Sequence, residues 1–217
     1  MLLENFYLNT LLLLIISYLL GSFPSAYIAG RIKGLDLRYT GSKNVGGMNT
    51  FSMVGKFAGV LVVIADFGKG ALAAFVADRL SSHPLIPMLA VVFAMIGHNW
   101  MAYIGFKGGK GISTFLGGLL YLAPLSFLFL YFIIVPIALI LLKDTYLSQT
   151  VAFFSFSFFL WAWYGTYWLA VFGILITLVY SIKSQELIKT YFTQNRRDLH
   201  PVLKKIFKPF FKEETRK

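Results

Sequence analysis

The chain has 217 residues, of which 58% are hydrophobic and only 13% are charged. A soluble domain of this length needs more polar surface, so the composition indicates a protein that has lipid as its solvent. A net charge of +11 would suggest nucleic-acid binding in a soluble protein, but here it favours cytoplasmic loops near anionic lipid. The absence of cysteine excludes disulfides, cysteine–zinc sites and cysteine nucleophiles.

Seven apolar segments are candidate membrane-spanning helices of an all-α polytopic protein. A spanning helix needs about 20 apolar residues, and the fourth segment, 112–122, is too short to cross alone. Pro124 separates it from the fifth, although the two could instead form one long kinked helix, which would lower the count to six. The candidates cover residues 8–30, 57–79, 85–104, 112–122, 125–142, 148–164 and 166–183.

The distribution of basic residues favours seven spans with the N-terminus outside. The inside segments then contain 18 of the 20 lysines and arginines, as the positive-inside bias predicts. With six spans, the basic tail would lie on the opposite side from the first two loops. These inside segments are 31–56, 105–111, 143–147 and 183–217.

This topology divides the chain into two parts. We expect one transmembrane domain over 1–183, with cytoplasmic loops 31–56 and 105–111. A basic, amphipathic cytoplasmic tail over 184–217 is expected to follow. The tail is either an interfacial helix on anionic lipid or a solvated basic end.

The first loop contains five glycines between residues 34 and 56, interleaved with small polar side chains. Glycine lets backbone N–H groups converge on an anion, and arginine offers a bidentate fork for phosphate. The polar candidates in this loop are Arg38, Ser42, Lys43, Asn44 and Asn49. The alternative is a flexible connector, although the whole segment 31–56, with 26 residues, is long for one.

The second loop reads Phe106-Lys107-Gly108-Gly109-Lys110-Gly111 and leads into Ile112-Ser113-Thr114. A glycine- and lysine-rich segment at a helix N-terminus is a typical setting for a phosphate group. The spacing does not match a Walker motif. A basic loop that only sets topology would need the lysines but not the glycines.

Three of the ionisable side chains in the predicted spans are candidate functional groups. Asp66 and Lys69 share one helical face, and are either functional groups or a buried pair in which each neutralises the other. His98 lies near the cytoplasmic end of the third span. It could act as a general base, orient a substrate, or be a helix-end histidine without a role.

These segments together resemble the bacterial acyl-phosphate:glycerol-3-phosphate acyltransferases, the PlsY family. The resemblance covers about residues 21–118. It is carried by GSFPSAYIAGRIKGLDLR (21–38), GSKNVGGMN (41–49), the Asp66–Lys69–Gly70 segment, and GHNW with FKGGKGISTFLG (97–117).

The resemblance implies a seven-span fold in the bacterial inner membrane, with cytoplasmic active-site loops. It also implies transfer of an acyl group from acyl phosphate to the 1-hydroxyl of glycerol 3-phosphate, giving lysophosphatidate and phosphate. No cofactor, metal or covalent intermediate is implied, and a partner enzyme would supply the acyl phosphate. By position, the resemblance assigns catalysis to Ser42, His98 and Lys110, and substrate binding to Arg38, Asn44, Asn49, Asp66, Lys69, Asn99, Lys107, Gly108, Gly109, Gly111 and Thr114.

Two positions depart from the family pattern. Ser52 stands where the family usually has an arginine, and Lys183-Ser184-Gln185-Glu186-Leu187-Ile188 replaces an RHRxNI segment. A catalytically altered paralogue that binds phosphorylated lipid precursors is therefore one alternative. Another is a transporter of a small phosphorylated solute, but the last three spans contain almost no polar residues beyond serine, threonine, tyrosine and Gln149.

Overall fold

The computed structural model describes residues 2–194, and these form helices joined by turns, with no strand among them. The long helices are α1 (Leu2–Ser22), α4 (Lys56–Leu80), α5 (Leu85–Asn99), α6 (Ile112–Leu122), α9 (Thr145–Tyr164) and α10 (Tyr167–Gln194). The shorter elements are α2 (Ser25–Ile32), α3 (Gly47–Met53), the 3₁₀ turn Ala102–Ile104, α7 (Pro124–Phe129), the π-helical turn Leu130–Ile134 and α8 (Val135–Leu142). Most of the predicted tail lies outside the described residues.

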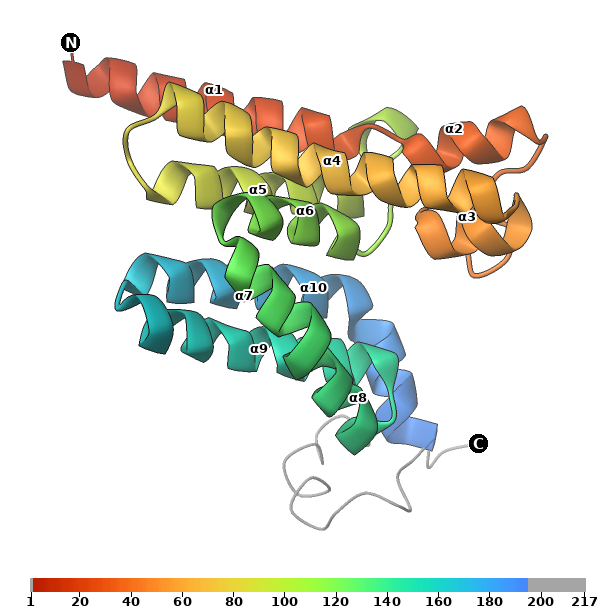
Figure 1. Ribbon diagram of the computed structural model, residues 1–217. Helices are drawn as coiled ribbons and strands as arrows, with labels where there is room; N and C mark the ends of the chain where they lie inside the picture. The colour runs from red at the N-terminus through yellow and green to blue at the C-terminus, as the bar shows by residue number, and fades with distance from the viewer. Residues whose placement is uncertain (1, 195–217) are drawn as a thin grey trace, which may run out of the picture.

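The helices form two groups that lie against each other (Figure 1). One group contains α1, α4, α5 and α6, with α2 and α3 at one end; the other contains α7 to α10. An aromatic core joins them, because Phe115 of α6 packs edge-on against Phe153 of α9, with ring centroids 5.1 Å apart. Tyr180 of α10 continues this core, 5.3 Å from the Phe153 ring.

Small residues allow the helices of the first group to approach closely. A Cβ atom on Gly70 of α4 would overlap the carbonyl oxygen of Thr114 in α6. A Cβ atom on Gly97 of α5 would likewise overlap the carbonyl oxygen of Tyr18 in α1. Contacts of this kind are typical of membrane helices, where packing has to replace the hydrophobic driving force.

Prolines set three of the helix boundaries. The predicted first span, 8–30, is two helices, since α1 ends at Ser22 and α2 begins after Pro24. Ala123, with φ of −154° and ψ of 75°, interrupts the helix between α6 and α7, so residues 112–142 do not form one continuous kinked helix. Pro136 lacks the N–H group that would bond the carbonyl of Phe132, and the wider π-helical turn lies at this point.

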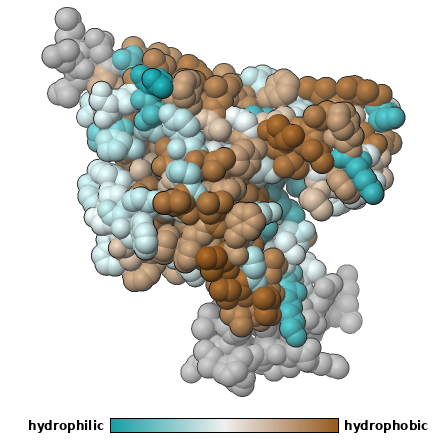
Figure 2. Space-filling view, viewed as in Figure 1, coloured by the Kyte–Doolittle hydropathy of each residue, from teal (hydrophilic) through white to brown (hydrophobic). Residues whose placement is uncertain are grey.

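The surface is that of a protein immersed in lipid. Large apolar side chains such as Phe57 and Ile140 are 77% and 73% exposed, and apolar side chains cover much of the face seen in Figure 2. Within residues 2–194, five segments are long and apolar enough to cross a membrane: Phe6–Ile32, Lys56–Leu80, Leu85–Ile104, Pro124–Leu142 and Tyr167–Thr190. The protein is therefore an all-α, multi-pass membrane protein, while the count of seven spans and the orientation stay predictions.

α10 continues without a break from Tyr167 to Gln194. The domain boundary drawn at residue 183 therefore falls inside a helix and not at a loop. The division into a transmembrane domain and a tail stays a prediction, because residues 195–217 are outside the described part of the chain.

Candidate functional site

One cavity, of about 450 Å³, gathers residues from five parts of the chain. Its walls come from the loop before α3 and α3 itself, from α4, from the end of α5, from the loop that leads into α6, and from the first turns of α9. Both glycine-rich segments contribute to the same cavity, as the sequence predicted. The predicted site residues that line it are Ser42, Asn44, Asn49, Asp66, His98, Lys110 and Gly111.

The first loop is folded around the side chain of Asn49. Its Oδ1 atom accepts a hydrogen bond from the backbone N–H of Ser42, 3.1 Å away, and its Nδ2 atom donates to the carbonyl of Thr40 at 3.0 Å. Gly41, in the left-handed region with φ of 63°, makes the turn that this closure requires. Asn49 therefore positions the backbone beside Ser42, in addition to lining the cavity.

The second loop packs directly onto the end of α5. The N–H of Gly109 donates to the carbonyl of His98 at 3.0 Å, and a Cβ atom on Gly109 would overlap His98 Nε2. A Cβ atom on Gly108 would overlap the carbonyl oxygens of His98 and Asn99. These glycines let the loop lie flat against α5, so that Lys110 reaches the cavity.

A buried polar cluster lies behind the cavity. Asp66 Oδ1 is 2.6 Å from Lys69 Nζ and accepts a hydrogen bond from Ser25 Oγ at 2.5 Å. His98 Nδ1 is 3.7 Å from the same carboxylate oxygen, too far for a hydrogen bond. Asp66 and Lys69 thus form the buried pair that was one of the two predicted alternatives, while Asp66 also lines the cavity.

Two predicted phosphate ligands are held away from the cavity by neighbouring side chains. Arg38 pairs with Asp36 at 2.7 Å, and this hydrogen-bonded guanidinium lowers the pKa of Asp36 to about 2. Lys107 donates to the hydroxyl of Tyr39 at 2.9 Å, which lowers the pKa of that hydroxyl. Neither Arg38 nor Lys107 lines the cavity.

The remaining predicted residues lie just behind the cavity wall. Gly108, Gly109, Asn99, Thr114 and Lys69 do not line it. Asn99 and Thr114 are fully buried, and their side-chain polar atoms have no hydrogen-bond partner within the described part of the chain.

The residues that α9 contributes were not predicted. Thr145, Tyr146 and Gln149 line the cavity, and Lys110 Nζ lies 3.8 Å from the centroid of the Tyr146 ring. They belong to no motif, and Gln149 stood out only as a lone glutamine in an apolar span.

Both departures from the family pattern lie near this site. Ser52 lines the cavity, and its hydroxyl is bonded to the carbonyl of Met48 within its own helix. Lys183 donates to the carbonyl of Asn99 at 2.5 Å, at the end of α5. Basic residues of the tail could replace the missing arginine in space. The candidates lie outside the described residues: Arg196, Arg197 and His200.

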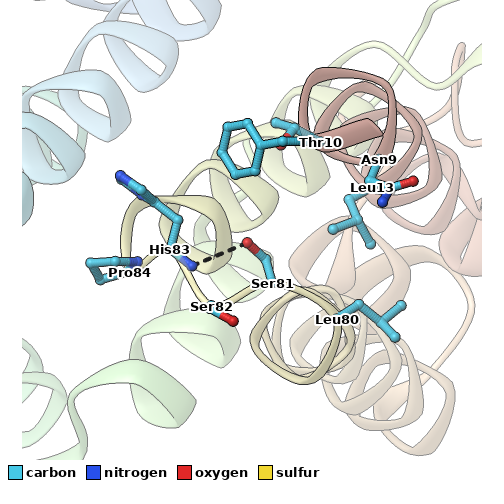
Figure 3. A pocket seen from close by; sticks show the side chains of 9 residues that line it. Asn9, Thr10, Leu13, Leu80, Ser81, Ser82, His83 and Pro84 are labelled. Carbon is cyan, nitrogen blue, oxygen red and sulfur yellow. Dashed lines mark hydrogen bonds between the residues drawn. The ribbon is translucent and has the colours of Figure 1, made fainter. Parts of the chain in front are cut away.

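A second cavity, of about 480 Å³, has different chemistry. It lies between the first turns of α1 and the turn from α4 to α5, where Thr10 and Asn9 face Ser81, Ser82 and His83 (Figure 3). No lysine, arginine, aspartate or glutamate lines it. The cavity that contains Lys110 therefore suits an anionic ligand better.

Comparisons with known proteins find relatives of one kind. A family model described as glycerol-3-phosphate acyltransferase matches residues 11–194. Glycerol-3-phosphate acyltransferase 2 of Dehalococcoides mccartyi (strain 195) is 40% identical over 178 residues, which cover 81% of this chain and 83% of that protein. The Synechococcus sp. (strain CC9902) glycerol-3-phosphate acyltransferase is 45% identical over 117 residues, which cover 54% of this chain and 58% of that protein.

Solved structures show the same fold. The crystal structure of PlsY (YgiH), an integral membrane glycerol 3-phosphate acyltransferase, in its glycerol 3-phosphate form has a TM-score of 0.75 and 31% sequence identity. The lysophosphatidic acid form has a TM-score of 0.74 and 30% identity; each alignment covers 85% of this chain and 92% of the solved chain. The chain therefore belongs to the glycerol-3-phosphate acyltransferase family.

Proposed function

We propose that this protein transfers a fatty acyl group from acyl phosphate to the 1-hydroxyl of glycerol 3-phosphate. The products are 1-acylglycerol 3-phosphate and inorganic phosphate, and an enzyme that makes acyl phosphate would supply the donor. The observation that carries the proposal is the cavity shared by both glycine-rich segments, which Lys110, His98 and Ser42 line together.

The cavity offers binding and orientation. Lys110 provides a positive charge for a phosphate group, and Ser42, Asn44 and Asn49 provide neutral hydrogen-bonding groups that suit a polyol. Holding the hydroxyl and the acyl carbon in one cavity replaces a bimolecular encounter, and this orientation contributes to the rate without a covalent intermediate.

The reaction balances without a protein nucleophile. The substrate hydroxyl oxygen bonds to the acyl carbon, the bond from that carbon to the phosphate oxygen breaks, and the hydroxyl proton leaves with the phosphate as hydrogen phosphate. The oxygen of the tetrahedral intermediate needs hydrogen-bond donors, and Lys110 and the nearby backbone N–H groups are suited to this role.

The test uses protein purified in detergent with palmitoyl phosphate as donor. Phosphate release should require glycerol 3-phosphate, and mass spectrometry should find 1-palmitoylglycerol 3-phosphate. Palmitoyl-coenzyme A, and glycerol without phosphate, test the choice of donor and acceptor. Absence of turnover with any acyl phosphate would contradict the proposal.

Ser52 and the altered segment at Lys183 favour one second candidate, a protein that binds the phosphorylated precursors without turnover. This candidate predicts that glycerol 3-phosphate binds in calorimetry although no phosphate is released. The same purified sample therefore distinguishes the two.

A further inference from the structure

The first turns of α9 form a wall of the cavity to which no motif assigns a role. Gln149 lies on this wall, half-buried, and Tyr146 lies one turn earlier on the same helix. Glutamine is costly in an apolar helix unless its amide is bonded.

The orientation of the Gln149 amide is set from behind by α10. The hydroxyl of Tyr180 donates to Gln149 Oε1 at 2.5 Å. Tyr180 is fully buried and its ring packs edge-on against Phe153, so the hydroxyl has little freedom to move. The carbonyl end of the amide is thereby held by α10.

The amino end of the same amide has no such partner. No residue between 6 and 190 accepts a hydrogen bond from Gln149 Nε2, although the side chain lines the cavity. An amide whose oxygen is held offers two N–H donors in a defined direction. A bound ligand with acceptor oxygens would satisfy them.

The charges of the cavity make such a donor useful. Lys110 is the one lysine or arginine among the described lining residues, and its ammonium group lies over the Tyr146 ring. A phosphate monoester carries nearly two negative charges at neutral pH, so one ammonium leaves part of its charge without a direct partner. Neutral donors on the neighbouring α9 wall can supply the remaining hydrogen bonds.

We propose that Gln149 binds glycerol 3-phosphate directly through its Nε2 group, and that Tyr180 is the positioning residue that orients this amide. The proposal rests on the proposed function for the identity of the ligand. Gln149 determines specificity for the polar acceptor and not for the acyl donor.

The test compares Gln149→Ala, Tyr180→Phe and the double variant in detergent. Each single variant should raise the KM for glycerol 3-phosphate by about 3- to 10-fold, the value of one neutral hydrogen bond. The KM for palmitoyl phosphate should not change. The double variant should be no worse than Gln149→Ala, because Tyr180 acts only through Gln149.

A matched control separates this effect from general damage. Tyr131→Phe removes the hydroxyl of an exposed tyrosine in the π-helical turn. This variant should behave as the wild type. If Gln149→Ala does not accumulate, Gln149→Glu keeps an acceptor for Tyr180 and replaces the donor with a repelling carboxylate, so the KM for glycerol 3-phosphate should rise further.

Calorimetry with glycerol 3-phosphate alone makes the result independent of turnover. Its Kd should rise by the same factor in Gln149→Ala and Tyr180→Phe. An unchanged Kd and KM in folded variants, or a change confined to palmitoyl phosphate, would overturn the proposal. A wild-type protein that binds glycerol 3-phosphate without releasing phosphate would instead refute the proposed reaction.

Discussion

Gly109→Ala tests whether the second loop positions His98. The added Cβ atom would lie 2.8 Å from the carbonyl oxygen of Val45 and 2.9 Å from His98 Cδ2, and would overlap His98 Nε2. Both neighbours are buried, His98 with 4% and Val45 with 1% of their surface exposed, so neither can move far. The backbone of Gly109 is not in the left-handed region, so crowding is the main effect of the substitution.

The expected loss is larger in activity than in stability. Overpacking of this size costs about 1–3 kcal/mol of stability, which a folded membrane protein can tolerate. The His98 ring must move by about 1 Å to clear the new Cβ atom, and a misplacement of about 1 Å can lower the rate about 100-fold. We therefore expect a fall in kcat/KM of roughly 10- to 100-fold, measured as phosphate release from palmitoyl phosphate, with only a modest fall in Tm.

Gly68→Ala is the matched control for this change. Gly68 lies in α4, and a Cβ atom there meets no other atom within 4 Å. This variant should keep full activity and gain slightly in helix stability. Near wild-type activity in a folded Gly109→Ala variant would refute the argument that this glycine sets the position of His98.

Three further predictions follow from charges. Lys110→Ala should raise the KM for the anionic substrates by about 10- to 100-fold. Lys107→Ala should have a smaller effect, because Lys107 does not line the cavity. Equal effects of the two variants in steady-state kinetics would contradict the placement of Lys110 in the cavity and Lys107 outside it. Asp66→Asn should lower the free energy of unfolding by about 3–5 kcal/mol, since it leaves Lys69 buried without its charged partner; an unchanged thermal transition in detergent would count against this. Arg79→Ala should leave phosphate release unchanged, because Arg79 is in the last turn of α4, far along the chain from the cavity residues of that helix.

The shared cavity could be predicted from the sequence because loops rich in glycine and lysine indicate phosphate binding, whereas lipid-facing apolar residues indicate no ligand. Loops on one side of a membrane must meet at one end of the bundle, so two such loops could be expected to lie together. Which basic side chain enters the cavity could not be predicted. Asp36 and Tyr39 hold Arg38 and Lys107 outside, and this pairing depends on the three-dimensional path of the loop.

The wall on α9 could not be predicted for a different reason. Its cavity residues are separated by apolar ones and lie about a hundred residues from the first loop. Only the packing of α9 against α10 and α6 shows that Tyr146 and Gln149 face the cavity. Motif reasoning finds residues that cluster in sequence, and this wall is assembled from a helix that otherwise reads as an ordinary span.

The buried cluster behind the cavity bears on the role of His98. Asp66 already accepts from Lys69 and Ser25, and its oxygen is 3.7 Å from His98 Nδ1, so the carboxylate is not arranged to orient this histidine as a base. A buried ion pair contributes little net stability compared with an apolar core, so its presence here needs another reason. We infer that the pair fixes α2 against α4 beneath the cavity, while His98 orients the substrate hydroxyl. The proton of the substrate hydroxyl can then leave with the departing phosphate, whose oxygens accept a proton more readily than the oxygen of the new ester.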